Sequence, residues 1–431
     1  MGPSVLSMVS IFLFTVVDGI FTGRGVGEDA LGAVNIAFPY VMIFSAVIML
    51  ATVGGLTVTA IRFGRGEIES ANNSFMHSFV LTVIIAAVFT FIGTVLVEPL
   101  SILLGANDTY MEMTRDYIFW YAVFMIPCGL CTTLGGFARN DGNPMLVMIG
   151  TVVATALNIF GDWFLMFPMH MGIKGAAIAT GVSQTVGFFI ALSHFILKKG
   201  NLHFAKFRFD AELLKKILVR GMPECVSQFN TPVTTIVMNK MIIALMGDMA
   251  VMAVNAYSVI GYVAAFSVAV FAGTAEGLQP LFGGCYGAKD EKDLKWYFRT
   301  GLVIGFAGAV IIYVILLFVG RPICELYALE WETLEYTMQT MPIYSLGFLV
   351  QPFTTIISSY LYSTTRTGHA LTINILKSFV LNTLVIIAIP LLVDAEMIWY
   401  GFAIYELIVL AAAATLLKKA DADGSIGSAL E

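Results

Sequence analysis

Residues 79–97 read FVLTVIIAAVFTFIGTVLV, a run without a single charged side chain. A helix rises about 1.5 Å per residue and the hydrocarbon core of a bilayer is about 30 Å thick, so this stretch is long enough to cross it. Similar apolar runs recur along the whole chain, for example at 302–319 and 379–393. Because one anchor does not account for this repetition, the sequence predicts a helical protein that crosses the membrane many times.

The composition excludes an ordinary soluble enzyme. Of the 431 residues, 58% are hydrophobic and only 12% are charged, and the mean hydropathy is +0.86. A soluble domain carries roughly 25% charged residues. The formal charge of −6 carries little information here, since the useful quantity is where Lys and Arg lie relative to the spans. We expect contact with the lipid bilayer and no nucleic-acid partner.

Turn and charge clusters predict an all-α fold of twelve transmembrane helices. The predicted spans are 4–22, 31–60, 74–103, 111–137, 144–167, 175–198, 213–246, 250–284, 293–319, 333–363, 369–393 and 396–417. The longest polar interruption falls near the middle of the chain. The predicted domains are therefore an N-terminal lobe (1–198), a cytoplasmic linker (199–212), a C-terminal lobe (213–419) and a tail (420–431) that is a disordered end or an expression scar.

The basic residues predict the orientation of the chain. Of the 23 Lys and Arg residues, 18, with Lys377 counted among them, are assigned to connections after even-numbered spans or to the C-terminal end. The other side holds Arg24, Arg115, Lys174, Lys240 and Arg321. Because Lys and Arg are enriched in cytoplasmic connections, both termini and the linker are predicted to be cytoplasmic.

The two halves of the chain resemble each other. Residues 27–35 (GEDALGAVN) recur as GDMAVMAVN at 247–255, with five identities in nine positions. Further on, Asn158 matches Asn382 at a nearly equal offset. The drift is small, as a duplication predicts. Two copies of six spans have the same orientation, so we expect two six-helix lobes related by a pseudo-two-fold axis along the membrane normal.

Four carboxylates lie well inside predicted spans: Asp18, Asp162, Glu224 and Glu276. The chain has no G-x-x-x-x-G-K-[ST] loop, so ATP binding of that kind is excluded and ion coupling is expected instead. Ionisable groups at membrane depth are costly and usually functional. The alternative is a purely structural role, in which a carboxylate near the end of a span reaches water or a helix terminus. This alternative is stronger for Glu224 and Glu276 than for the two aspartates.

Polar side chains at helical spacing support the two aspartates. Thr151, Thr155, Asn158 and Asp162 form one stripe on an otherwise apolar helix. Comparable stripes are Thr15, Asp18 and Thr22; Tyr110, Thr114, Tyr117 and Tyr121; and Thr180, Ser183 and Gln184. Small polar residues also form ordinary interhelical hydrogen bonds, which is the alternative reading. In the repeat, Met238 and Ile386 replace the two acids, so the coupling chemistry is expected in the N-terminal half.

Several motifs together carry a resemblance to a known family. They are residues 17–27 with 33–35, 139–144, 158–162, 175–180, and 277–280 with 286–288. Through them, the chain from Pro3 to Lys419 resembles the multidrug and toxic compound extrusion (MATE) family, in its MepA-like prokaryotic branch.

The resemblance implies two lobes around a V-shaped cavity in a prokaryotic cytoplasmic membrane, and antiport of H+ or Na+ against amphipathic organic cations, with no other cofactor. We also expect a monomer. The family's N-lobe cation-coupling site falls on Asp18, Tyr117, Asn158, Asp162 and Thr180, and Na+ would be held by all of these except Tyr117. The acidic pair of some Na+-coupled relatives has no clear match in spans 7 and 10.

The predicted substrate cavity combines polar, acidic and polarizable side chains. Its residues are Tyr121, Gln184, Met238, Met241, Glu224 and Glu276. Met and aromatic side chains adapt to many flat lipophilic cations. One rival function is a flippase for lipid-linked oligosaccharides or polysaccharides, which would need cationic residues inside the lobes. Lys and Arg are nearly absent from the predicted membrane interior. The other, a membrane-embedded enzyme with catalytic residues, calls for a cluster of His, Cys or acidic residues, and the five histidines show no metal-binding spacing.

Overall fold

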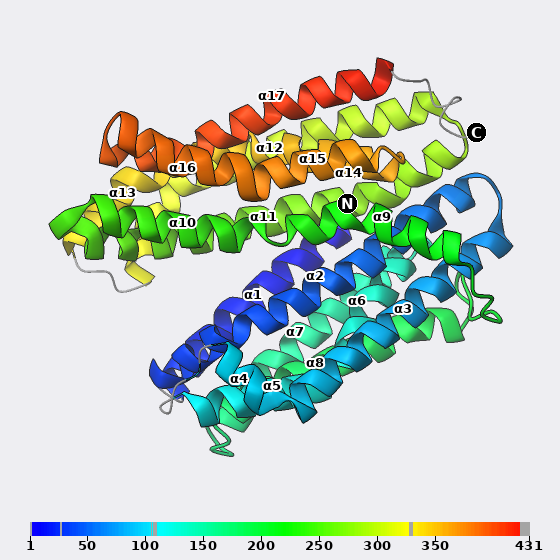
Figure 1. Ribbon diagram of the computed structural model, residues 1–431, viewed down its shortest axis with the longest axis horizontal. Coiled ribbons are helices and arrows are strands. Elements are labelled where there is room, and N and C mark those ends of the chain that lie inside the picture. The colour runs from blue at the N-terminus through cyan, green and yellow to red at the C-terminus, as the bar shows by residue number, and fades with distance from the viewer. Residues whose placement is uncertain (1, 26–27, 105, 107–109, 327–330, 423–431) are drawn as a thin grey trace. The chain divides into compact units, whose positions relative to one another are not determined.

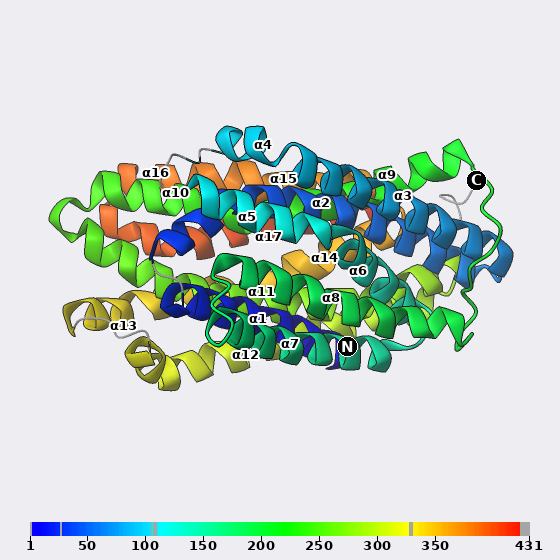
Figure 2. The ribbon, with the colours of Figure 1, turned by 90° about the horizontal axis from the view of Figure 1, so that it is seen from below.

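The computed structural model describes residues 2–25, 28–104, 106, 110–326 and 331–422 (Figures 1 and 2). The helices up to the middle of the chain are α1 (Gly2–Gly25), α2 (Glu28–Gly64), α3 (Ile68–Val95), α4 (Val97–Leu103), α5 (Met111–Val123), α6 (Met125–Asn140), α7 (Pro144–Met166), α8 (Ile173–Ile196) and α9 (Ala211–Ser227). The others are α10 (Asn230–Leu245), η1 (Gly247–Met249), α11 (Ala250–Gly287), α12 (Glu291–Leu326), α13 (Trp331–Ser345), η2 (Leu346–Leu349), α14 (Gln351–Ser363), α15 (Thr367–Ile375), the π-helical η3 (Leu376–Val380), α16 (Leu381–Leu392), η4 (Ala395–Tyr400) and α17 (Gly401–Ala422).

These helices reproduce the predicted spans. Within the described residues, eight helices are long and apolar enough to cross a membrane alone, and the pair α5 and α6, bent by 51°, makes a ninth. The remaining predicted spans coincide with α1, with α9 followed by α10, and with α13 followed by α14. Prolines lie inside α9 and α13, where a missing backbone N–H weakens the helix. The prediction of twelve membrane helices is confirmed.

By its contacts the chain divides into an N-terminal unit (Gly2–Met222) and a C-terminal unit (from Pro223 onward). The division falls inside α9, because Leu213 and Ile217 pack with Val58 of α2. Residues 199–222, predicted as a linker and the start of the second lobe, therefore pack with the N-terminal unit. The domain scheme itself stays a prediction.

Both units use the same helix pairings, as the internal repeat predicts. In the N-terminal unit, α2 packs on α3, α1 on α7, α7 on α8, and α6 on α8. The corresponding pairs of the C-terminal unit are α11 with α12, α10 with α16, α16 with α17, and α14 with α17. Figure 1 shows α7 beside α8 and α16 beside α17. Each unit is thus a bundle of six membrane-crossing segments with one shared plan.

The outer faces of both bundles are apolar. Large side chains such as Phe91, Leu103, Phe318 and Leu392 are exposed. In water such surfaces are rare, whereas in a bilayer they contact the lipid tails. The buried polar side chains lie inside the bundles, among apolar core residues. The functional residues are therefore expected on the inner faces.

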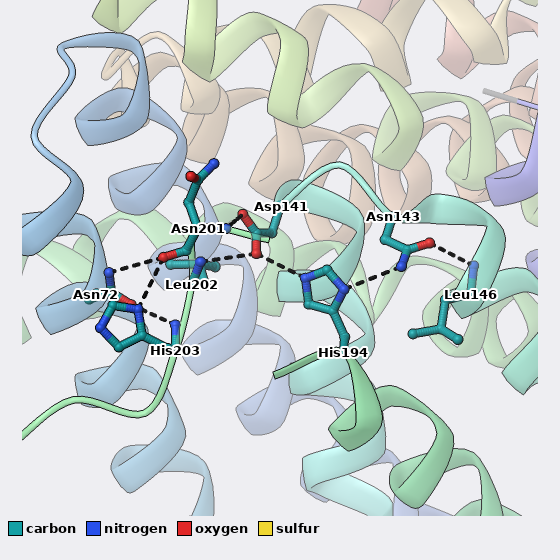
Figure 3. A network of polar contacts seen from close by, with 8 residues as sticks. All are labelled: Asn72, Asp141, Asn143, Leu146, His194, Asn201, Leu202 and His203. Atoms are coloured by element: carbon teal, nitrogen blue, oxygen red, sulfur yellow. Dashed lines mark hydrogen bonds and ion pairs between the residues drawn. The ribbon is translucent and has the colours of Figure 1, made fainter. Parts of the chain in front are cut away.

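A buried polar cluster holds the connection after α8 against the N-terminal unit (Figure 3). The Asp141 carboxylate, in the turn between α6 and α7, accepts hydrogen bonds from the backbone N–H groups of Asn201 (2.9 Å) and Leu202 (3.0 Å). It also accepts one from Nε2 of His194 (2.9 Å), and the Asp141 and His194 side chains are only 1% and 0% exposed.

The neighbouring residues fix this cluster. Asn143 caps α7 by accepting the Leu146 N–H through Oδ1, so its Nδ2 faces Nδ1 of His194. With Nδ1 of His194 accepting from Asn143, the Nε2–H group of the ring donates to Asp141. Gly142, between Asp141 and Asn143, has φ +86°, a conformation that favours glycine. The motif at 139–144 is thus explained as a structural clamp.

Asp141→Ala is expected to lower the free energy of unfolding by about 3 kcal/mol, because three N–H groups, those of His194 Nε2, Asn201 and Leu202, lose their acceptor together. Unfolding of the purified protein in mixed micelles, titrated with SDS, measures it. The control is Glu325→Gln, which breaks the exposed Arg321–Glu325 pair (3.3 Å) and should change stability by less than about 0.5 kcal/mol. Equal effects of the two changes would contradict the clamp.

Candidate functional site

The N-terminal unit brings together three of the predicted coupling residues on α7 and α8. Asn158 donates through Nδ2 to Oγ1 of Thr180 over 3.2 Å. Asp162, one turn after Asn158 on the same face of α7, is completely buried. The side-chain amide oxygen of Asn158, Oδ1, has no hydrogen-bond partner among the residues that the structure describes. The site thus holds a buried carboxylate beside an amide oxygen and a hydroxyl.

Small residues allow α7 and α8 to approach closely at this level. A Cβ placed on Gly161 would lie 3.0 Å from Cβ of Ala179. Such close packing of small side chains is typical of helix pairs in membranes. On the other side, Thr155 of α7 donates to the Ser10 carbonyl of α1 over 3.4 Å. The α7 stripe therefore lies between α1 and α8.

The structure places the other predicted N-terminal residues as follows. Tyr117 is buried on α5 and stacks on the half-buried Tyr121 with ring centroids 6.0 Å apart. Gln184 is half-buried on α8. Asp18 lies in α1, but its side chain is outside the part of the chain that the structure describes. The shared Asp18–Asp162 site therefore stays a prediction.

The donor atoms around Asp162 fit a hard ion. Carboxylate, amide and hydroxyl oxygens are the ligands that Na+ and similar cations prefer, and the carboxylate alone can take a proton. Among the described residues, no group of three or more His, Cys, Asp or Glu side chains has the arrangement of a metal site. The oxygen set is thus compatible with H+ or Na+, and its role in ion coupling stays a prediction.

In the C-terminal unit, Glu224 and Glu276 lie within electrostatic range of each other. Oε1 of Glu224 accepts hydrogen bonds from Ser227 and Gln228, both over 3.1 Å. The charges of both acids also reach the hydroxyl of Tyr362 on α14. The two acids, predicted as one candidate, thus share one region.

The two predicted methionines lie on α10 of the same unit. Met238 is fully buried and Met241 is half-buried. Neither lines the pocket described next, and their role as a cavity wall stays a prediction.

A pocket in the C-terminal unit has an empty volume of about 390 Å³, including space open to the surroundings. Its lining includes Asn230, Thr234, Tyr257, Tyr344, Gln351, Phe402 and Tyr405, and carries no charged side chain. Tyr344 stacks on Phe402 with centroids 4.7 Å apart. Oδ1 of Asn230 and Oε1 of Gln351 have no hydrogen-bond partner among the described residues. The lining thus offers aromatic rings and amide oxygens to a small polar ligand.

The repeated asparagine has a different partner in each unit. Asn158 bonds to Thr180 of α8, whereas Asn382 donates to Oγ1 of Thr234 on α10 over 2.6 Å. In the C-terminal unit this hydrogen bond lies at the edge of the pocket, because Thr234 lines it. The duplicated residue thus makes a different contact between helices in each unit.

One sequence assignment is wrong. Lys377, counted with the connections, lies inside a membrane-crossing segment, in the π-helical turn between α15 and α16. Its ammonium nitrogen is 2.8 Å from Oε1 of Glu406, which is completely buried on α17. The count was inconsistent with the predicted span 369–393, which already contained this residue. The expectation that the spans nearly lack cations needs the same correction.

Sequence analysis also missed Glu406, although a signal was present. This acid interrupts the apolar run of the last predicted span, as Asp162 interrupts the fifth. The structure adds its partners: Thr354 of α14 donates to Oε2 of Glu406 over 2.9 Å, and Lys377 donates to Oγ1 of Thr354 over 2.9 Å. A buried three-residue ionic cluster therefore exists in the C-terminal unit.

Two bundles of membrane-crossing helices, each with acids buried among apolar side chains, define a polytopic membrane protein of the transporter class. The MatE family model matches residues 3–164 and 223–387, so the chain belongs to the MATE family. Membership confirms the resemblance found in the sequence.

Named relatives agree with this family. The chain is similar to the FAD transporter of Shewanella oneidensis, with 24% identity over 344 residues that cover 78% of this chain and 74% of the relative. It is also similar to the probable multidrug resistance protein YoeA of Bacillus subtilis (26% over 373 residues; 83% and 78%) and to the multidrug export protein MepA of Staphylococcus haemolyticus (22% over 360 residues; 80% and 78%).

Solved structures show the same fold. An outward-facing multidrug resistance MATE transporter of the MOP superfamily matches with a TM-score of 0.89 and 20% identity, covering 96% of this chain and 95% of that one. A variant of the Vibrio cholerae MATE transporter VcmN matches with a TM-score of 0.90 and 21% identity, covering 98% and 96%.

Proposed function

We propose that this protein is a secondary active efflux transporter that exchanges H+ or Na+ for amphipathic organic cations by alternating access. The observation that carries the proposal is the completely buried Asp162 beside Asn158 and Thr180 inside a membrane-crossing bundle. Burial in apolar surroundings disfavours the charged form of a carboxylate, so binding of a proton or a cation there is favoured and can change when the site opens to the other side. Family membership and the multidrug-export relatives support the same function.

The coupling residues are proposed to be Asp18, Tyr117, Asn158, Asp162 and Thr180. When Asp162 carries a proton or Na+, its charge is neutralised and no longer attracts an organic cation. When the ion leaves, the negative charge returns and favours the substrate. Ion and drug thus compete for one charge, which is the requirement for exchange.

The location and orientation are part of the proposal. The protein is proposed to lie in a prokaryotic cytoplasmic membrane as a monomer, with both termini in the cytoplasm. The excess of Lys and Arg on one side of the predicted spans supports this orientation, since it persists when Lys377 is removed from the count.

Transport in proteoliposomes tests the function. Purified protein is reconstituted into liposomes, and the liposomes are loaded with ethidium. A pH gradient and a Na+ gradient are then imposed in separate experiments. Ethidium should move against its own gradient under at least one of the two, and protein-free liposomes set the background. Failure of both gradients to drive ethidium movement would contradict the proposal.

A flavin is the second candidate substrate, favoured by one observation. The pocket lining of the C-terminal unit is uncharged and offers aromatic side chains and amide groups, the kinds of groups that contact flat heteroaromatic rings. The FAD transporter among the relatives points the same way. Competition of FAD with ethidium in the same liposomes distinguishes the two substrate classes.

A further inference from the structure

One face of α14 carries a line of buried polar side chains, the α14 polar stripe. Its members are Gln351, Thr354, Ser358 and Tyr362, spaced at i, i+3, i+7 and i+11. At about 1.5 Å per residue they extend over roughly 16 Å, about half of the hydrocarbon thickness. Polar groups at this depth are costly unless they are used, so the stripe needs an explanation.

Each member of the stripe contacts a different polar group. Gln351 lines the pocket. Thr354 bonds to both Lys377 and Glu406. Ser358 donates to Oδ1 of Asn374 over 2.9 Å.

The far end of the stripe reaches the acidic pair. Asn374 in turn donates to the Pro223 carbonyl over 2.6 Å, at the residue that precedes Glu224. Tyr362 lies within range of the charges of Glu224 and Glu276. The stripe therefore runs from the pocket to these two acids within one unit.

The Lys377–Glu406 pair is the charged point on this line. Its ammonium already neutralises the carboxylate, so a metal cation would meet a positive charge 2.8 Å from its ligand. A proton needs no such space, because it bonds directly to a carboxylate oxygen. The other titratable groups near Glu406 are Tyr344 and Tyr405, and Cys225 lies near Glu224 at the far end.

We propose that the C-terminal unit has its own proton site at Lys377 and Glu406, connected by the α14 polar stripe to the pocket and to Glu224 and Glu276. A proton from the pocket side bonds to the Glu406 carboxylate, which becomes a neutral acid and releases its hold on the Lys377 ammonium. Loss of the proton restores the ion pair. Neighbours on the stripe are about 5–6 Å apart, a gap that one water bridges.

The π-helical turn fits this role. Lys377 lies in η3, where one extra residue per turn opens the helix, and such turns are frequent at functional sites. The Lys377–Glu406 ion pair connects this turn to α17, so breaking or forming the pair changes the interaction between them. The site would thus link protonation to the packing of α16 and α17 around the pocket. This inference goes beyond the proposed coupling site, which lies in the N-terminal unit.

Thr354 gives the sharpest test, since it can be changed without altering any charge. Thr354→Val removes the hydroxyl at nearly constant shape, while Thr354→Ser keeps it. In liposomes with pyranine inside, Thr354→Val is expected to slow ethidium-dependent proton movement about tenfold. Thr354→Ser should stay within about threefold of the wild type. Equal rates for all three proteins would overturn the proposal.

A second variant removes the charges together. Lys377→Met with Glu406→Gln leaves no unpaired buried charge, so the double variant is expected to fold. Its ethidium-dependent proton movement should also fall about tenfold. The matched control is Lys295→Gln with Glu291→Gln, which removes an exposed pair of the same residue types (3.3 Å) and should change nothing. Wild-type proton movement in the buried double variant would overturn the proposal.

Infrared spectroscopy tests the site without transport. On acidification, purified wild-type protein should gain a protonated-carboxyl band that the buried double variant lacks and the control variant keeps. Identical spectra for the wild type and the buried double variant would overturn the proton site.

If ethidium does not move in the wild type, the proposed function fails, but this spectral difference still decides the proton site. If only Asp162→Asn stops transport, the proposed function stands and the second site is wrong.

Discussion

Asp162→Asn is expected to reduce gradient-driven ethidium efflux about 100-fold or more while the protein still folds. The amide has nearly the same shape as the carboxylic acid but cannot gain or lose a charge in this pH range. Asp162 is completely buried, so its charge has little competition from water and dominates the local field. Initial efflux rates in proteoliposomes under imposed pH and Na+ gradients measure the loss.

The control is an acid of the same unit outside the polar centre. Asp116 forms an ion pair with the partly exposed Lys174 (2.9 Å), and Asp116→Asn should keep efflux within about threefold. If Asp162→Asn retained wild-type efflux, Asp162 would not belong to the mechanism. Binding of ethidium to the variant, measured by fluorescence anisotropy, separates lost binding from lost coupling.

Asp18 extends this test to a residue whose side chain the structure does not describe. Because the sequence predicts Asp18 and Asp162 in one site, the double Asn variant should lose little more than either single variant. Independent effects that multiply would show that the two acids act separately.

The membrane helices were predictable because they depend on local composition. An apolar run of sufficient length forms a helix in lipid whatever its neighbours are, since each backbone N–H and C=O must be satisfied within the segment. The stripe of Asn158 and Asp162 was predictable for a similar reason, because helical periodicity alone places them on one face.

The ionic cluster of the C-terminal unit was not predictable in the same way. Thr354 and Glu406 are far apart in sequence, and only packing of α14 against α17 brings them together. Lys377 was counted with the connections although the predicted span 369–393 contains it, because a lone Lys at membrane depth has no visible partner in the sequence. Its ion pair with Glu406 makes it tolerable inside the membrane, and such pairing is visible only in three dimensions.

The same reasoning predicts a large stability effect for breaking this pair on one side. Lys377→Met leaves the Glu406 charge buried without its partner, and Glu406→Gln does the same to Lys377. Each single change is expected to lower the free energy of unfolding by about 3–5 kcal/mol. The double variant should recover most of that loss, since two neutral side chains of similar size need no compensation.

A double-mutant cycle measures this coupling directly. The four proteins are unfolded with SDS in mixed micelles, and the double variant is compared with the sum of the single changes. Two single losses of about 3–5 kcal/mol add to at least about 6 kcal/mol, whereas the double variant should lose only a small part of that. The departure from additivity should therefore exceed about 3 kcal/mol, far above the roughly 0.5 kcal/mol error expected for independent sites. Additive effects would mean that Lys377 and Glu406 do not stabilise each other. Strong coupling would instead show that the ion pair stabilises the packing of α16 against α17. Protonation of Glu406 would then weaken this packing, because it breaks the same ion pair that Glu406→Gln breaks.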